Sequence, residues 1–148
     1  MQIKRWLNLS GSIAQGPSTF YDEANSYQGD RTSTSFSIGL QPNARVSDKI
    51  SYSFVTFDRR STGENVYQVH IINTRNTYQF TPRLLARAIA QFDSSRRRIL
   101  GDFLASYELA PGTVAHAGYG SLFENPDGGS YAATARAFFF KVSYLASF

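Results

Sequence analysis

The sequence predicts an all-β protein, an antiparallel up-and-down meander of about eight strands. Apolar and polar residues alternate with a period of two along most of the chain, and turn-forming residues separate the alternating segments. No segment of useful length has helical periodicity. With 148 residues the chain suits one domain, which we expect to span residues 1–148.

Composition excludes several classes of protein. The chain has no cysteine, which rules out a disulfide framework and any thiolate metal site. Its 12 Phe and 9 Tyr argue against disorder, and a net charge of +4 is too small for a dedicated nucleic-acid binder. No apolar run is long enough for a membrane-spanning helix, and no signal peptide is visible in this chain.

The alternation defines the strands and the face on which each residue lies. The predicted strands are Gln2–Ser12, Ser33–Gln41, Lys49–Asp58, Glu64–Phe80, Leu84–Asp93, Arg98–Leu109, Thr113–Phe123 and Arg136–Phe148. A loop at Pro42–Asp48 would close the first hairpin, with Ile38 opposite Tyr52 and Phe36 opposite Phe54. The apolar faces of these two strands then coincide, as a hairpin requires.

The long strand Glu64–Phe80 changes parity part-way. Tyr67 and Ile71 fall on one face, whereas Ile72 and Phe80 fall on the other. A β-bulge near Ile72 would reconcile the two halves, because one extra residue reverses the alternation.

Short turns are predicted between the later strands. Thr81–Arg83 makes a tight turn, and Ala110–Gly112 is a hairpin loop whose glycine suits positive φ. A turn at Ser94 and Ser95 would place Arg87 across from Asp102, and Gln91 across from Arg98.

Three features favour a membrane barrel over a soluble one. The polar face carries small residues such as Ser35, Ser51 and Ser143, as a crowded lumen requires. The long connections Ile13–Arg31, Arg59–Gly63 and Glu124–Ala135 fall at one end, and the short ones at the other. The chain also ends in a strand of alternating aromatic residues. We therefore expect a transmembrane β-barrel.

Two segments resemble known outer-membrane proteins. The segment Ala137–Phe148 (AFFFKVSYLASF) resembles the C-terminal signal that the bacterial barrel-insertion machinery recognises. The matching residues are Phe138, Phe140, Val142, Tyr144 and Phe148. The segment Asn76–Gly112 (NTYQFTPRLLARAIAQFDSSRRRILGDFLASYELAPG) resembles the last hairpins of TonB-dependent-receptor-like barrels.

The second resemblance points in particular to outer-membrane proteins with a sugar-binding-like N-terminal module and a C-terminal barrel domain. It implies a bacterial outer-membrane location, a structural or transport-related role, and contact with the barrel-insertion machinery during assembly. No N-terminal module or plug domain is visible in this sequence. The chain is therefore expected to be a small eight-stranded barrel or the closing segment of a larger one.

Charged and polar residues of the later strands should point into the lumen. They are Arg87, Gln91, Arg98, Asp102, Ser106, Glu108, His116 and Lys141. Their simplest role is a structural network of ion pairs and hydrogen bonds, because unpaired charges in a narrow barrel are costly. The alternative is a lumen that binds or passes a polar solute.

Arginines cluster at the long-loop end. Arg59 and Arg60 lie in one connection, and Arg96 and Arg97 precede Arg98 in another. Guanidinium groups suit bidentate contacts with the phosphates of lipopolysaccharide, although a solvated polar turn would have the same composition.

Tyrosines near strand ends suit an interfacial aromatic girdle. These side chains are Tyr52, Tyr78, Tyr107, Tyr119 and Tyr144, together with Trp6. Two other functions stay open, a soluble lipocalin-like ligand-binding barrel and a lipid-modifying enzyme. The latter would use His70 with Asn73 or Ser53, but no spacing in the chain requires a catalytic triad, a metal site or a cofactor.

Overall fold

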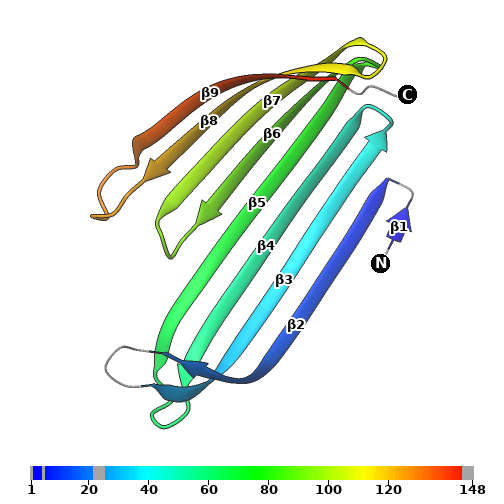
Figure 1. The fold of residues 1–148 in the computed structure, drawn as a ribbon. Helices are drawn as coiled ribbons and strands as arrows, with labels where there is room; N and C mark the ends of the chain where they lie inside the picture. The colour runs from blue at the N-terminus through cyan, green and yellow to red at the C-terminus, as the bar shows by residue number, and fades with distance from the viewer. Residues whose placement is uncertain (1, 5, 22–25, 145–148) are drawn as a thin grey trace.

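The computed structural model describes residues 2–4, 6–21 and 26–144 as one antiparallel sheet (Figure 1). Its nine strands follow one another in chain order, and β1 is a short piece beside β2. The strands are β1 (Gln2–Lys4), β2 (Leu7–Phe20), β3 (Tyr27–Asn43), β4 (Val46–Arg59), β5 (Asn65–Thr81), β6 (Leu84–Asp93), β7 (Arg98–Ala110), β8 (Thr113–Glu124) and β9 (Ala132–Tyr144). The predicted all-β meander of about eight strands is confirmed.

The first half of the chain contains more strand than predicted. The predicted strand Gln2–Ser12 is divided into β1 and the start of β2, and most of the expected loop Ile13–Arg31 belongs to β2 and β3. Apolar alternation is weak there because Gln15 and Thr19 share a face with Ile13. The connection between β2 and β3 is therefore limited to residues 21–26.

The first predicted hairpin has the right faces but the wrong register. Ile38 pairs with Ile50 and Phe36 with Tyr52, two residues away from the expected partners. The strands continue through most of Pro42–Asp48, since Asn43 Oδ1 accepts hydrogen bonds from the N–H groups of Arg45 and Val46 at 2.8 and 3.0 Å. This side-chain cap closes a two-residue turn at Ala44–Arg45.

The β6–β7 register also differs from the prediction by two residues. Arg87 pairs with Leu104 and Asp102 with Ile89, so Arg87 does not face Asp102 directly. Likewise, Gln91 pairs with Leu100 and Arg98 with Asp93. The connection has four residues, Ser94–Arg97, because Asp93 Oδ1 accepts hydrogen bonds from the N–H groups of Ser95 and Arg96. A shift of two residues leaves every side chain on its predicted face.

The expected bulge near Ile72 is absent. Pairing runs without a shift past Ile72 on both sides of β5, and the irregularity lies at the end of that strand, between Phe57 and Asp58 of β4. The parity change has another cause: the apolar residues of β5 move to the opposite face toward its N-terminal end.

The two ends of the sheet differ in shape (Figure 1). At one end the turns are short: Ala44–Arg45, Pro82–Arg83 and Pro111–Gly112. Gly112 has φ of 82°, as the sequence predicted for this hairpin. We call this the short-turn end, and the opposite one the long-loop end. At the long-loop end β2–β5 project beyond the later strands.

A cluster of aromatic rings holds the projecting part together. Phe57 is 1% exposed, the only large side chain among the described residues that is fully buried. Its ring stacks on Tyr67 with 5.6 Å between ring centroids and lies 5.8 Å from Phe20, which stacks on Tyr27. Gly29 lies directly under the Phe57 ring, where a Cβ would collide with it. We call these four rings the aromatic cluster.

We expect Gly29→Ala to lower stability by about 1–3 kcal/mol, because the added methyl group overpacks the aromatic cluster. Gly39→Ala is the matched control, since a Cβ there meets only ordinary contacts at 3.7 Å. Denaturant unfolding of both variants measures the difference. Equal midpoints would show that the cluster tolerates the extra volume.

Candidate functional site

The register divides the sheet into two faces of different chemistry. One row of directly paired residues is Phe36, Tyr52, Ile72, Phe92, Ile99 and Phe123. The adjacent row on the other side is Ser37, Ser51, Asn73, Gln91, Leu100 and Leu122. We call the side of the first row the apolar face and the side of the second the polar face.

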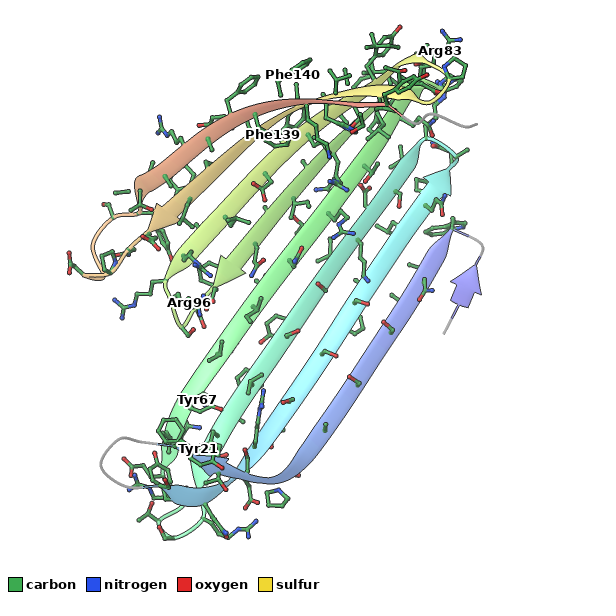
Figure 2. The ribbon with its side chains drawn as sticks, viewed as in Figure 1. Tyr21, Tyr67, Arg83, Arg96, Phe139 and Phe140 are labelled. Atoms are coloured by element: carbon green, nitrogen blue, oxygen red, sulfur yellow. The ribbon has the colours of Figure 1, made fainter. Side chains whose placement is uncertain are left out.

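The two faces also differ in exposure. Large apolar side chains on the apolar face are exposed, including Ile72 at 41%, Phe103 at 50% and Phe140 at 67%. In contrast, Phe57, Asp93 and Ser106, the buried strand side chains, all lie on the polar face. The polar face is therefore the more enclosed side of the sheet. Figure 2 shows Phe139 and Phe140 projecting from opposite faces of β9.

The structure places the predicted lumen residues on the polar face. These residues are Arg87, Gln91, Arg98, Asp102, Ser106, Glu108, His116 and Lys141. Within residues 2–4, 6–21 and 26–144 no ion pair involves any of them. Their side chains share a surface without forming the predicted ion-pair network.

One hydrogen bond does join this group. Ser106 pairs with His116 across β7 and β8, with 2.8 Å between Ser106 Oγ and His116 Nδ1. Ser106 is 7% exposed, and Lys141 pairs with His116 on its other side. The serine and the histidine form a buried polar contact at the short-turn end.

The arginines do not form one basic rim. Arg60 donates hydrogen bonds to Asp30, and Arg59 lies 3.6 Å from Glu64 and 4.0 Å from the centre of the Tyr27 ring. These contacts hold Arg59 and Arg60 against the projecting part of the sheet.

Arg96 and Arg97 lie elsewhere. Asp93, which begins their loop, pairs with Ile71, whereas Asp58 pairs with Asn65 at the far end of β5. Six residues of β5 separate these levels, or about 20 Å. Figure 2 likewise shows Arg96, in the β6–β7 loop, well apart from Tyr67, near the start of β5. Arg97 has φ of 45°, and its guanidinium lies beside Gly128 of the β8–β9 loop.

The chemistry of the faces reverses at the long-loop end. On the apolar face, one row of paired residues is entirely polar: Gln15, Thr32, Thr56 and Gln68. On the other face, the aromatic cluster takes the place of the serines. The projecting part therefore has a polar exterior and an aromatic interior, and this reversal explains the parity change in β5.

His70 is not placed for the catalytic grouping considered from the sequence. It lies on the apolar face, where its Nδ1 is 2.8 Å from Tyr52 Oη and its ring is 4.8 Å from Phe54. Asn73 and Ser53 lie on the polar face, because they differ in parity from His70 and its partner Phe54. The sheet itself separates these side chains.

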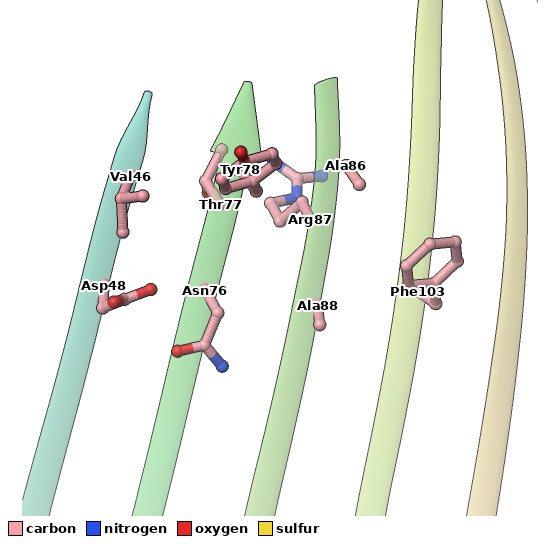
Figure 3. Close-up of a pocket in the computed structure, with 9 residues that line it drawn as sticks. All are labelled: Val46, Asp48, Asn76, Thr77, Tyr78, Ala86, Arg87, Ala88 and Phe103. Atoms are coloured by element: carbon pink, nitrogen blue, oxygen red, sulfur yellow. The ribbon is translucent and has the colours of Figure 1, made fainter. Parts of the chain in front are cut away.

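The structure also has a shallow pocket on the apolar face (Figure 3). It has a volume of about 210 Å³ and lies over β4–β7 near the short-turn end. Ala86 and Ala88 form its floor between Tyr78 and Phe103. Small side chains between large ones create this dip, and no convergent group of polar atoms gives it a binding chemistry.

The described residues form neither a metal site nor a membrane-spanning helix. Within the part of the chain that the structure describes, no three His, Asp or Glu side chains gather as a metal site would need. No helix among these residues is long and apolar enough to cross a membrane. No family model matches the sequence, and no curated protein or solved structure is detectably similar to it.

Sequence reasoning missed the aromatic cluster and the polar row outside it. Phe20, Tyr27 and Gln15 lie in the segment Ile13–Arg31, which was expected to be loop, whereas Phe57 and Tyr67 lie in predicted strands. The signal that could have found the cluster was the two pairs of aromatic residues, Phe20 with Tyr27 and Phe57 with Tyr67. Of the proposed insertion signal, Phe138, Phe140, Val142 and Tyr144 lie on the apolar face of β9. Phe148 lies outside the described residues.

We expect Ser106→Ala to lower the free energy of unfolding by about 1–2 kcal/mol, since it leaves the partly buried His116 nitrogen without its partner. Ser51→Ala is the control, because Ser51 Oγ is 3.5 Å from its acceptor, the Asn73 carbonyl oxygen. Unfolding midpoints in urea measure both effects. Equal losses would mean that the Ser106–His116 contact adds nothing specific.

Proposed function

We propose that this chain is a bacterial outer-membrane β-barrel protein with a structural or transport-related role. Its apolar face would contact lipid, and its polar face would line the interior. The observation that carries the proposal is the burial on the two faces: many large apolar side chains of the apolar face are exposed, whereas Asp93 and Ser106 of the polar face are buried. A water-soluble sheet has the opposite arrangement.

Energetics support the lipid environment. Hydrating apolar surface costs roughly 25 cal/mol per Å², and soluble monomers rarely expose apolar patches beyond a few hundred Å². The apolar face continues from Phe36 on β3 to Phe140 on β9, and Phe140 is 67% exposed. In a bilayer this surface contacts acyl chains and the cost disappears. A lipocalin-like barrel would instead have to turn this face inward, away from the side on which Phe57 is buried.

The last strand supports the proposed assembly route. Phe138, Phe140, Val142 and Tyr144 share the apolar face of β9 and are between 52% and 74% exposed. β9 is also the last strand of the sheet, with one neighbour, β8. An exposed aromatic strand with an open edge is a surface that the barrel-insertion machinery could bind by strand pairing. The proposal includes no catalytic step, metal or cofactor.

Neighbouring residues of β5 test which face meets lipid. Because the chain has no cysteine, Ile72→Cys and Asn73→Cys each give one site for a fluorescent label. After refolding into vesicles, we expect brominated acyl chains to quench the label at position 72 strongly and the label at position 73 weakly. Equal quenching, or a chain that folds in water without lipid or detergent, would overturn the proposal.

We further propose that Arg96 and Arg97 contact the phosphates of lipopolysaccharide. Both lie in the β6–β7 loop at the long-loop end, where an outer-membrane barrel has its outer surface. Arg59 and Arg60 are left out of this proposal because Glu64, Tyr27 and Asp30 already engage them.

The double variant Arg96→Ala, Arg97→Ala should lose most of the rise in melting temperature that lipopolysaccharide gives the parent protein. Arg45→Ala, Arg83→Ala removes the same charge at the opposite, short-turn end and should retain that rise. Thermal unfolding in detergent with and without lipopolysaccharide measures both. If both variants respond like the parent, these arginines are solvated turn residues.

A further inference from the structure

The outermost long strands, β2 and β9, have backbone groups along matching lengths that pair with no other described strand. Trp6 O accepts a hydrogen bond from Gln41 N–H, so the even-numbered residues of β2 bond to β3, and its odd-numbered residues from Gly11 to Thr19 point to the open edge. Asn125 N–H donates to Arg97 O, so the odd-numbered residues of β8 bond to β7 and its even-numbered residues bond to β9. The partners of these even-numbered residues are the odd-numbered residues of β9, which leaves the even-numbered residues of β9 at the open edge. In lipid no water is present to satisfy these groups, so leaving them unpaired is strongly unfavourable.

Direction and parity allow these edges to pair with each other. In an up-and-down meander, β2 and β9 are the first and last of eight long strands, so they run antiparallel. Odd residues of β2 and even residues of β9 both have side chains on the apolar face. Hydrogen bonds between these two sets therefore keep both faces continuous around a closed sheet.

Strand tilt limits the register. With strands about 4.8 Å apart and a rise of about 3.3 Å per residue, a shear of eight residues tilts eight strands by about 35°. A shear of ten gives about 41°, and twelve gives about 46°. An odd shear would place the apolar face of β2 beside the polar face of β9. Membrane barrels tilt by about 35–45°, which allows eight and ten and places ten in the middle of the range.

The ends of the apolar band on β4 and β9 agree with this shear, whereas the paired row from Phe36 to Phe123 by itself sets no slope. Phe54 and Phe138 are the last large apolar residues on this face of β4 and β9 before the long-loop end. Across the sheet, the pairing from Phe54 passes through His70 on β5 and Ser94 just after β6, and it reaches Asn125 just after β8. Phe138 pairs with Tyr119, six residues before Asn125 on β8.

A membrane band must be level around the barrel. Phe54 and Phe138 reach one height only if the register descends six residues over the five strand-to-strand steps from β4 to β9. Extended to eight strands, this slope is about ten residues, the value in the middle of the tilt range.

We propose that the sheet closes on itself in the membrane, with Gly11–Phe20 of β2 paired to Ala135–Tyr144 of β9 at a shear of ten. This inference rests on the proposed function and selects the self-contained barrel over the closing segment of a larger one. The opposite sense of shear leaves β2 and β9 without overlap. In this register Ser12 faces Ser143 and Gly16 faces Phe139.

Side chains at the seam fit this register. Ser12 Oγ lies 2.8 Å from Ser35 Oγ, and Ser143 would extend this row of small hydroxyl residues on the polar face. Gly16 has open space above it, which leaves room beside the large Phe139 ring. Pro17 lacks an N–H, so one bond of the ladder is missing at its pair with Phe138.

A closed sheet of this size has a narrow interior. Eight strands tilted by about 41° give a backbone radius of about 8 Å, which side chains fill. The role that follows is structural, or at most the binding of one small polar solute. Conduction through a wide pore is excluded by this geometry.

Cysteine cross-linking tests both the seam and its register. Ser143→Cys is combined with Ser10→Cys, Ser12→Cys or Ala14→Cys, which correspond to shears of eight, ten and twelve. Directly opposed residues have Cα atoms within disulfide reach, whereas positions two residues away are too distant. Each double variant is refolded into vesicles, oxidised, and compared with the same chain oxidised in urea.

We expect an intramolecular disulfide in the folded Ser12→Cys, Ser143→Cys variant and little in the other two. Preferential cross-linking of another pair would overturn the register, and disulfide-linked dimers would show that a second copy covers the edge. No cross-link in lipid-folded protein would mean that other strands cover both edges, while the outer-membrane proposal stands. A chain that folds only in water would remove the outer-membrane proposal itself.

Discussion

Backbone hydrogen bonding at the two outer strands is the constraint on which the rest of the structure depends. Each strand from β3 to β8 has a long neighbour on both sides, whereas β9 has only β8, and the outer side of β2 has only the three-residue β1. An exposed, apolar edge strand is unstable in water and more so in lipid, where nothing else can satisfy its N–H and C=O groups. In the proposed barrel, the strand tilt, the register and the level of the apolar residues would all follow from the pairing of these two edges.

The division of chemistry between the faces follows from that constraint. Small serines occupy the polar face of β2–β4, whereas larger residues such as Arg87 and Leu104 occupy it on β6 and β7. The narrow interior of the proposed barrel would need both, since large side chains from one wall would fill the space that small ones leave at the other. The large exposed residues of the apolar face would then lie on the outside of the proposed barrel.

Much of this arrangement could be predicted from the sequence. Alternation identified β4, β6–β9 and the later parts of β3 and β5, with the face of nearly every residue in them, because a strand has a fixed period of two. Register could not be predicted as well, since it depends on turn chemistry. The Asn43 cap and the four-residue Ser94–Arg97 loop each moved the pairing by two residues, which changed the partners of Arg87 and Asp102 without changing their face.

The candidate site was less predictable than the fold. Parity placed Ser106 opposite His116, but the assumed turn at Ser94 and Ser95 gave pairings between β6 and β7 that the observed register does not allow. The long-loop end was missed for a different reason: there the polar residues lie outside and the aromatic ones inside, so alternation loses its usual contrast. Arg59 and Arg60, assigned to a common basic rim, instead brace this separate layer.

The unequal strand lengths give the proposed barrel a lopsided outline. A strand of 17 residues such as β3 or β5 would stand about 42 Å tall at a tilt of about 41°, whereas the 10 residues of β6 would stand about 25 Å tall. The shorter height equals the hydrocarbon band of an outer membrane. The projecting part of β2–β5 would therefore rise above the bilayer on one side, and the aromatic cluster would stabilise it there. Molecules approaching from outside would meet long strands on that side of the barrel and short strands that end near the membrane surface on the other.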